Sequence, residues 1–167
     1  MRYTYAGSPV GELLLAGDDD GLAALFLPES YRSAPRRADR VQPGWVRADD
    51  AFDDVRAQLG EYFAGTRTEF DLRLNLRGSA FQRRVWAALL EIPHGTTTSY
   101  GAIAADLGMP GAARAVGLAN GQNPVSIIVP CHRVVGANGS LTGYGGGLPA
   151  KRFLLSLEAA GAGLFAL

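Results

Sequence analysis

Two short helical segments separated by glycine and proline most constrain the fold of this 167-residue chain. The first is expected to begin near Ser99 and to end at Gly108. The second is expected to begin at Ala112, directly after Pro110-Gly111. Two short helices joined by such a turn are the sequence outline of a helix-turn-helix. The pattern therefore predicts a helical unit in the second half of the chain.

The segments on either side extend this unit. Ser79 and Gln82 form an S-x-x-Q capping box, which predicts the start of another helix after Ser79. Asn138-Gly139 lies between apolar residues and predicts a hairpin turn, so the predicted order is helix-turn-helix followed by a wing. A last helix is expected over residues 148–160, with Gly161 as its C-cap.

The first half of the chain carries strand patterns. Residues 12–16 and 22–27 predict two strands joined into a hairpin by a glycine- and aspartate-rich turn. Apolar residues at three- and four-residue spacing predict an amphipathic helix over 52–62, which Gly65 ends. Alternating apolar residues in 70–76 predict a half-buried strand. This half shows no catalytic pattern, so we expect it to be a scaffold.

The chain is therefore predicted to be α+β with two domains. Residues 1–77 are expected to form a small N-terminal α/β domain, and residues 78–167 a winged helix-turn-helix domain. Residues 28–47 are rich in proline and arginine and lack periodicity, which predicts a mobile loop.

Composition narrows the class of protein. Apolar residues make up 47% of the chain, enough for a packed core. One cysteine excludes an intramolecular disulfide and a multi-thiolate zinc site, so we expect no metal. No signal peptide begins the sequence, and no apolar run approaches the roughly 18 residues of a membrane span. A lone thiol also fits a reducing compartment, so we expect a cytoplasmic protein.

The charges are balanced overall but unevenly placed. Residues 1–77 hold 10 arginines against 13 acidic residues, a net charge of −3. Residues 78–167 hold 6 basic and 3 acidic residues, a net charge of +3. A polyanionic partner is therefore expected to meet the second half, with modest and salt-sensitive affinity.

Cys131 is the single cysteine, and it lies in an apolar run between Pro130 and His132. A free thiol has a pKa of about 8.5, so only a few per cent is thiolate at neutral pH. His132 is a candidate base. Consecutive side chains rarely face each other, so it would need either an unusual backbone conformation for direct contact or a bridging water. The alternative is a buried, inert thiol beside a satisfied histidine, and these residues alone favour it.

Glu158 bears on the choice between a catalytic and an inert Cys131 thiol. It lies on the apolar edge of the last predicted helix, where a carboxylate is costly unless it is paired. His132 is a better partner than His94, and a base oriented by a carboxylate follows the logic of catalytic triads. The alternative is a surface charge near the end of a helix, and both interpretations stay open.

Three further features are candidates for binding. Arg114 lies early in the predicted recognition helix, where arginine meets phosphates or base edges, or is simply solvated. Tyr100 could present its hydroxyl to a ligand or pack at a helix start. Residues 141–147 include four glycines, which permit close backbone approach or make a flexible surface loop.

Together these segments resemble the O6-alkylguanine-DNA alkyltransferase family. The signature Pro130-Cys131-His132-Arg133-Val134 matches the active-site motif of that family. The surrounding order also matches, in Ser99-Tyr100, Ala113-Arg114-Ala115-Val116-Gly117, Asn123-Pro124, Tyr144-Gly145-Gly146-Gly147, Lys151 and Glu158. The good match spans about residues 78–161. The first half resembles the ribonuclease-H-like N-terminal domain of the family only in length and strand-helix order.

The resemblance implies a catalytic role for five residues. Cys131 would be the alkyl acceptor, and His132 would deprotonate it through a water. Glu158 would orient His132, and Asn123 would brace the turn between the recognition helix and the active-site segment. Tyr100 would donate to N3 of the flipped base and crowd its 3′ phosphate.

The resemblance also implies how DNA is held. Arg114 would enter the base stack and fill the vacated place, within a DNA-binding helix that includes Ala113, Ala115 and Gly117. The substrate-base pocket would be formed by Val134, Tyr144, Gly145 and Lys151. In that pocket the carbonyls of Cys131 and Val134 would read the exocyclic amine, and the Tyr144-Gly145 loop would contact O6. Gly145 stands where some relatives have a serine.

The implied function is stoichiometric, irreversible alkyl transfer from O6-alkylguanine, and from O4-alkylthymine, in duplex DNA after base flipping. No cofactor is implied. The implied partner is double-stranded DNA approached through the minor groove, bound by a monomer that could assemble cooperatively along it. The alternatives are a lesion-sensing winged-helix protein without chemistry and a Cys/His hydrolase.

Overall fold

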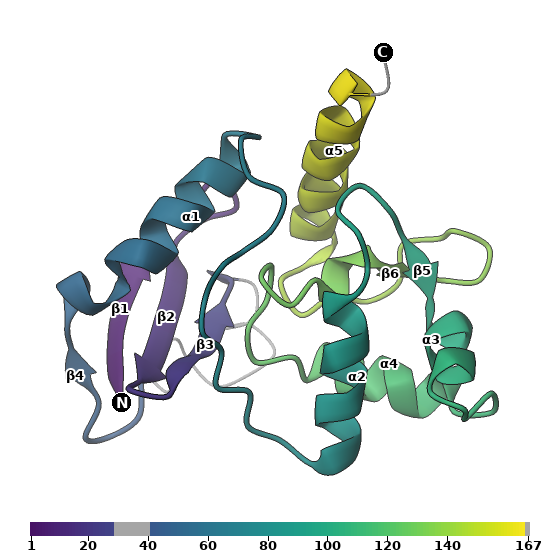
Figure 1. Ribbon diagram of the computed structural model, residues 1–167, viewed down its shortest axis with the longest axis horizontal. Coiled ribbons are helices and arrows are strands. Elements are labelled where there is room, and N and C mark those ends of the chain that lie inside the picture. The colour runs from purple at the N-terminus through teal and green to yellow at the C-terminus, as the bar shows by residue number, and fades with distance from the viewer. Residues whose placement is uncertain (29–40, 166–167) are drawn as a thin grey trace.

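A four-stranded sheet and one α-helix form the first half of the chain (Figure 1). The computed structural model describes residues 1–28 and 41–165. The strand order is β3-β2-β1-β4, in which β1, β2 and β3 are antiparallel neighbours and β4 runs parallel to β1. The elements are β1 (Arg2–Ala6), β2 (Leu13–Asp18), β3 (Gly21–Phe26), β4 (Val46–Arg47), the 3₁₀ helix η3 (Asp49–Phe52) and α1 (Asp53–Phe63).

The hairpin and the helix predicted for this half are confirmed. Gly21 has a φ of +132°, and a Cβ there would lie 2.6 Å from the carbonyl oxygen of Arg73, so the turn requires glycine. Gly65, with a φ of +80°, follows the end of α1 as predicted. The buried residues of α1 are Val55, Leu59 and Tyr62, as the apolar spacing predicts.

Two predictions for this half are wrong. Residues 70–76 form only a single bridge, between Leu22 and Leu74, because the free edge of β3 is shared. One end of that edge pairs with residues 73–75, and the other pairs through Leu25 with Val125, so a longer strand has no partner. Residues 46–47, predicted to lie in a mobile loop, form β4. Most of that loop, residues 29–40, lies outside the described residues.

The second half contains the predicted helix-turn-helix, made by α3 and α4. The capping box at the start of α2 is confirmed, since Ser79 and Gln82 each bond the backbone N–H of the other at 3.1 and 2.8 Å. Trp86 on α2 donates its indole N–H to the carbonyl of Ala119 on α4 at 2.9 Å. The elements are α2 (Ala80–Leu90), β5 (Thr98–Ser99), α3 (Tyr100–Asp106), α4 (Ala113–Gly121), the 3₁₀ helix η4 (Cys131–Arg133), β6 (Val134–Val135) and α5 (Leu148–Phe165).

The predicted wing and the predicted end of the last helix are corrected. A turn does form at residues 136–140, where the Gly136 N–H bonds the Ser140 carbonyl at 2.9 Å. However, β6 pairs in parallel with β5 and not with the residues after that turn. Gly161 lies inside α5 and is not its C-cap, because it lacks the positive φ that such a cap requires.

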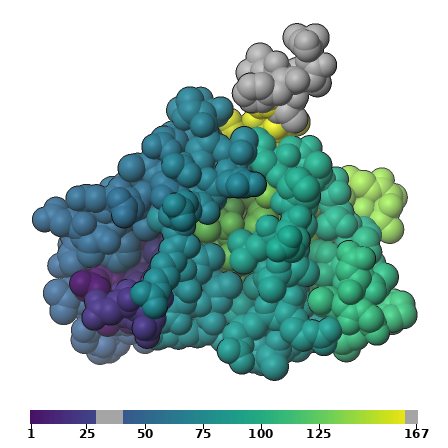
Figure 2. Space-filling model, viewed as in Figure 1, coloured from purple at the N-terminus to yellow at the C-terminus, as the bar shows by residue number. Residues whose placement is uncertain are grey.

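The two halves lie side by side (Figure 2), and they share one apolar core. This cluster joins β2, β3 and α1 of the first half to α2, α4 and α5 of the second. Backbone bonds also cross between the halves, from Leu25 N–H to the Pro124 carbonyl at 2.9 Å and from Ser126 N–H to the Leu25 carbonyl at 3.2 Å. The sheet edge thereby supports the segment that leads to Cys131.

We predict that Ser79→Ala lowers the free energy of unfolding by about 1 kcal/mol, because it removes the N-cap of α2. Urea denaturation measures the change. Ser156→Ala is the matched control, since Ser156 is exposed within α5 and caps nothing in the described structure, and it should be neutral. Equal losses in both variants would contradict the role of the cap.

Candidate active site

A strained, tightly bonded turn presents Cys131. The Asn123 side chain closes it, donating from Nδ2 to the Val129 carbonyl at 2.8 Å and accepting from the Val125 N–H at 2.9 Å. Ile127 has a φ of +72°, the one positive value of a non-glycine residue in the described part of the chain. This conformation is costly for a β-branched side chain and persists only where surrounding contacts enforce it. The turn is therefore a rigid support, and Asn123 is its brace.

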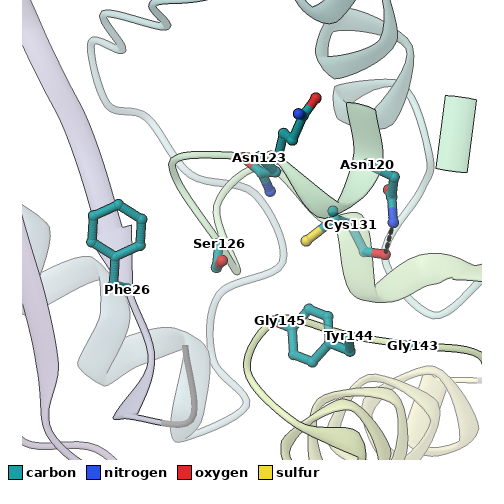
Figure 3. A pocket seen from close by; sticks show the side chains of 10 residues that line it. Phe26, Asn120, Asn123, Ser126, Cys131, Gly143, Tyr144 and Gly145 are labelled. Carbon is teal, nitrogen blue, oxygen red and sulfur yellow. Dashed lines mark hydrogen bonds between the residues drawn. The ribbon is translucent and has the colours of Figure 1, made fainter. Parts of the chain in front are cut away.

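Cys131 begins η4 and borders a cavity of about 180 Å³. Its residue is 4% exposed, and Figure 3 shows the sulfur directed away from Asn120, towards the side where Ser126 lies. Phe26 of β3 also borders the cavity, so the first half, predicted to be only a scaffold, contributes a wall. The lining residues are Phe26, Asn120, Gly121, Gln122, Asn123, Ser126, Cys131, Gly143, Tyr144 and Gly145.

The thiol is not activated by its surroundings alone. Burial raises the pKa of Cys131, and a hydrogen bond with Asn123 and the charge of Lys151 offset this only in part. A base is therefore needed to form the thiolate at neutral pH.

His132 has the properties of such a base. It is fully buried, and its Nε2 lies 2.7 Å from Oε2 of Glu158. Burial lowers the pKa of His132, which favours the neutral form of the ring at pH 7. An ionised carboxylate only accepts hydrogen bonds, so Nε2 carries the proton and Nδ1 keeps a lone pair. Nδ1 is buried and has no partner among the described residues.

Glu158 is buried and accepts several hydrogen bonds. The alternative interpretation, a surface charge near the end of a helix, is therefore wrong. Glu158 is 1% exposed and accepts four hydrogen bonds. Arg133 donates from Nε at 2.7 Å and from Nη2 at 3.1 Å, Tyr62 donates its hydroxyl at 2.6 Å, and His132 donates at 2.7 Å. Burial alone would raise the pKa of Glu158, but the hydrogen bonds from His132 and Arg133 outweigh it and hold the pKa below its ordinary value.

Sequence reasoning missed Arg133 and Tyr62 as members of this network. Arg133 stands in the signature motif, and its position beside His132 was the available signal. Tyr62 lies on the apolar face of α1, where a buried hydroxyl needs a partner, but no pattern pointed to a residue 96 positions away. Arg133 also donates from Nη1 to the Ile92 carbonyl at 2.6 Å, which fixes the guanidinium.

Three buried polar atoms in the described structure have no hydrogen-bond partner, and all belong to residues beside or at the cavity. They are Oδ1 of Asn120, Nδ1 of His132 and the hydroxyl of Tyr144. Buried polar groups are normally paired, so unpaired ones call for a functional explanation. Asn120 and Tyr144 line the cavity next to Cys131, which is consistent with a ligand that supplies the missing partners.

The remaining predicted pocket residues divide into two groups. Tyr144 and Gly145 line the cavity, whereas Val134 and Lys151 do not. Lys151 is buried and donates from Nζ to the Val134 carbonyl at 2.7 Å and to the Thr142 carbonyl at 3.2 Å. It thereby ties the glycine-rich loop to β6. Burial lowers the pKa of Lys151.

Tyr100 and the predicted DNA-binding residues lie on the helix-turn-helix. The Tyr100 hydroxyl is 2.7 Å from Oγ1 of Thr142, so it also contacts the glycine-rich loop. Arg114 and Ala115 are exposed on α4, while Ala113 and Gly117 are half-buried. A Cβ at Gly117 would lie 3.6 Å from the Tyr100 ring, so only a small residue leaves space there. Arg114 has no partner in the described part of the chain, so its guanidinium is available to a ligand.

Residues 1–28 and 41–165 contain neither a metal-binding cluster nor a membrane-spanning helix. No group of three or more His, Cys, Asp or Glu side chains there could hold a metal ion. Within those same residues, no helix has the length and apolar character needed to cross a membrane.

Comparison with known proteins identifies the family. Residues 1–76 match the ribonuclease-like domain, and residues 80–160 the DNA binding domain, of 6-O-methylguanine DNA methyltransferase. A methylated-DNA–protein-cysteine methyltransferase of Mycolicibacterium paratuberculosis is 56% identical over 159 residues, 95% of this chain and 92% of that protein. The Methanosarcina acetivorans protein of the same name is 49% identical over 95% of this chain and 98% of its own.

A solved structure agrees with these relatives. The crystal structure of Mycobacterium tuberculosis OGT in complex with DNA matches with a TM-score of 0.86 at 52% identity, over 96% of this chain and 94% of that one. The fold and the site thus define a DNA alkyltransferase. The chain belongs to the O6-methylguanine DNA methyltransferase family, with the enzyme activity of a methylated-DNA–protein-cysteine methyltransferase and with DNA as its partner.

We predict that Glu158→Gln lowers the free energy of unfolding at pH 7 by about 3 to 5 kcal/mol, because it leaves Arg133 buried without its counter-charge. The folded pKa of Glu158 lies below the ordinary value of 4.5. Its stabilising contribution is therefore complete above about pH 5 and decreases as the pH falls further. Urea denaturation of both proteins from pH 7 to pH 3 should show the difference between them narrowing in acid.

Glu61→Gln is the matched control. Glu61 is exposed and pairs with Arg67 at 2.6 Å on the surface, so its loss should cost less than about 1 kcal/mol. A Glu158→Gln protein as stable as this control at pH 7 would contradict the role of Glu158 as the buried counter-charge.

Proposed function

We propose that Cys131 accepts the alkyl group of O6-alkylguanine, and also of O4-alkylthymine, in duplex DNA. The observation that carries this proposal is His132, a buried imidazole with an unpartnered Nδ1 and a lowered pKa, which follows the single cysteine in the sequence. Nε2 of this ring bonds Glu158, and its free Nδ1 can take a proton from a thiol.

The proton first moves from the Cys131 thiol to Nδ1 of His132, through a water because no described contact joins the two side chains. The imidazolium that forms keeps its Nε2–H bond to Glu158, whose negative charge stabilises it. The thiolate then attacks the alkyl carbon, forming the S–C bond as the C–O6 bond breaks. The electron pair passes to the guanine, which leaves as an anion that a hydrogen bond from Tyr100 stabilises.

The product is a thioether on Cys131, and water does not hydrolyse it. His132 can return its proton to the guanine, but nothing in this site can release the alkyl group from sulfur. Each protein molecule would therefore act once, in a stoichiometric and irreversible repair reaction.

The cavity supports base flipping. An alkyl carbon on O6 cannot reach a 4%-exposed sulfur while its base is stacked in a duplex, so the base must leave the helix. The amide of Asn120 and the hydroxyl of Tyr144 would then find partners on the base edge. The Tyr100 hydroxyl would exchange its bond with Thr142 for one to N3.

The helix α4 would bind the DNA through the minor groove. Its exposed face carries Arg114 and the small residue Ala115, so the backbone of the helix can approach the groove closely while Arg114 enters the stack. Ala113 and Gly117 extend the same small-residue surface. We further propose a cytoplasmic monomer that needs no cofactor and that can assemble cooperatively along DNA.

A lesion sensor without chemistry is the second candidate, because burial raises the pKa of Cys131 and favours an inert thiol. A hydrolase would use the same Cys/His pair differently.

One experiment separates the alkyltransferase, the lesion sensor and the hydrolase: incubation with duplex DNA carrying one O6-methylguanine, followed by mass analysis of the peptide that contains Cys131. We predict one added methyl group per protein molecule and no second turnover.

Cys131→Ser is the control, and it should bind the same duplex with unchanged affinity while showing no added mass. An unmodified cysteine in a wild-type protein that binds the lesion would favour the sensor. Repeated turnover on an ester or peptide would favour the hydrolase. Either result would overturn the proposal.

A further inference from the structure

Among the described residues of the first half, Tyr62 is the side chain that hydrogen-bonds to Glu158. Tyr62 lies on α1, is 1% exposed, and donates its hydroxyl to Oε2 of Glu158 at 2.6 Å. Its ring is held on several sides by the rings of Phe63, Phe70 and His94, at centroid distances of 5.2, 5.4 and 6.2 Å. The hydroxyl is therefore fixed in place by the packing of α1.

Tyr62 and His132 donate to the same oxygen atom. Oε2 of Glu158 accepts from the Tyr62 hydroxyl at 2.6 Å, from Nε2 of His132 at 2.7 Å, and more weakly from Nη2 of Arg133 at 3.1 Å. Donors that share one acceptor divide its negative charge between them. A carboxylate that is stabilised by other donors stabilises a neighbouring imidazolium less.

Tyr62 also stays a donor across the working pH range. Burial and the charge of Glu158 raise the pKa of Tyr62, so its hydroxyl keeps its proton. The bond to Oε2 is thus present whenever Glu158 is ionised, and the hydrogen bonds to Glu158 hold its own pKa low.

We propose that Tyr62 is a positioning residue for the transfer reaction: by sharing Oε2 with His132, it fixes the carboxylate and limits the proton affinity of the base. The first half of the chain would thereby set the basicity of a base located in the second half. This inference rests on the proposed function, in which His132 takes the thiol proton.

The charged and titratable groups around this network come from every element packed on it. They are Tyr62 on α1, His94 after α2, Cys131, His132 and Arg133 in η4, Tyr144 in the glycine-rich loop, and Lys151 and Glu158 on α5. Of these, only His94 and His132 have an ordinary pKa near 6.5. The acidic limb of a rate profile is the range in which the rate falls as the pH decreases. A shift of that limb could come from His94 or from His132, and a His94 variant distinguishes the two.

Tyr62→Phe tests the proposal, because it keeps the ring packing and removes only the hydroxyl. The single-turnover rate of methyl transfer from O6-methylguanine DNA to Cys131 is measured from pH 5 to pH 9. We predict that the acidic limb moves to higher pH by roughly half a unit or more, since Glu158 then attracts the His132 proton more strongly. The double variant Tyr62→Phe, His94→Gln should show the same displacement.

Tyr3→Phe is the matched control, since Tyr3 lies on β1 of the same half and has no described contact with Glu158. The acidic limb of the rate profile should not move in this variant. An unmoved limb in Tyr62→Phe, with or without a uniform loss of rate, would overturn the proposal and leave Tyr62 a packing residue. A limb that moves only when His94 is present would also overturn it. Absence of transfer in the wild-type protein would instead refute the proposed function, so the two failures are distinguishable.

Discussion

The structure depends on one buried carboxylate. Glu158 on α5 accepts hydrogen bonds from α1 through Tyr62 and from η4 through His132 and Arg133, so three distant segments meet at two oxygen atoms. A buried charge is tolerated only when it is paired and fully hydrogen-bonded, and here Arg133 supplies the counter-charge. Because Glu158 and Arg133 neutralise each other, His132 can remain neutral in the same apolar surroundings. The network thus keeps a proton acceptor in a place where burial alone would favour inert groups.

The rigid turn that precedes Cys131 complements the network around Glu158. Asn123 bonds both arms of the turn, and the sheet edge at Leu25 holds the segment that follows it. The positive φ of Ile127 shows that the turn is held against its own conformational preference. A thiol presented in this way cannot swing to meet a substrate. The reacting carbon must be brought to it, which is the physical reason why extrusion of the base is part of the proposed reaction.

Much of the fold and of the candidate site could be predicted from the sequence. The capping box at Ser79, the helix-turn-helix and the Cys131-His132 pair are local patterns, and local patterns are visible in one sequence. The partnership of Tyr62 with Glu158 could not be predicted, because a tyrosine on an apolar helix face has the same pattern whether its hydroxyl meets solvent or a carboxylate. The strand expected at 70–76 failed for a related reason, since the edge of β3 was already shared with residues 124–126. Competition for a partner is a tertiary property that periodicity does not encode.

The tautomer of His132 is the most direct test of the claim that this network prepares a neutral base. Nitrogen-15 NMR of the side chain at pH 7 reports which ring nitrogen carries the proton, with His94 as a reference in the same sample. We predict a neutral ring protonated at Nε2, with Nδ1 showing the shift of an unprotonated nitrogen. A proton on Nδ1, or an imidazolium at pH 7, would contradict the claim, because neither form could accept the thiol proton through that atom.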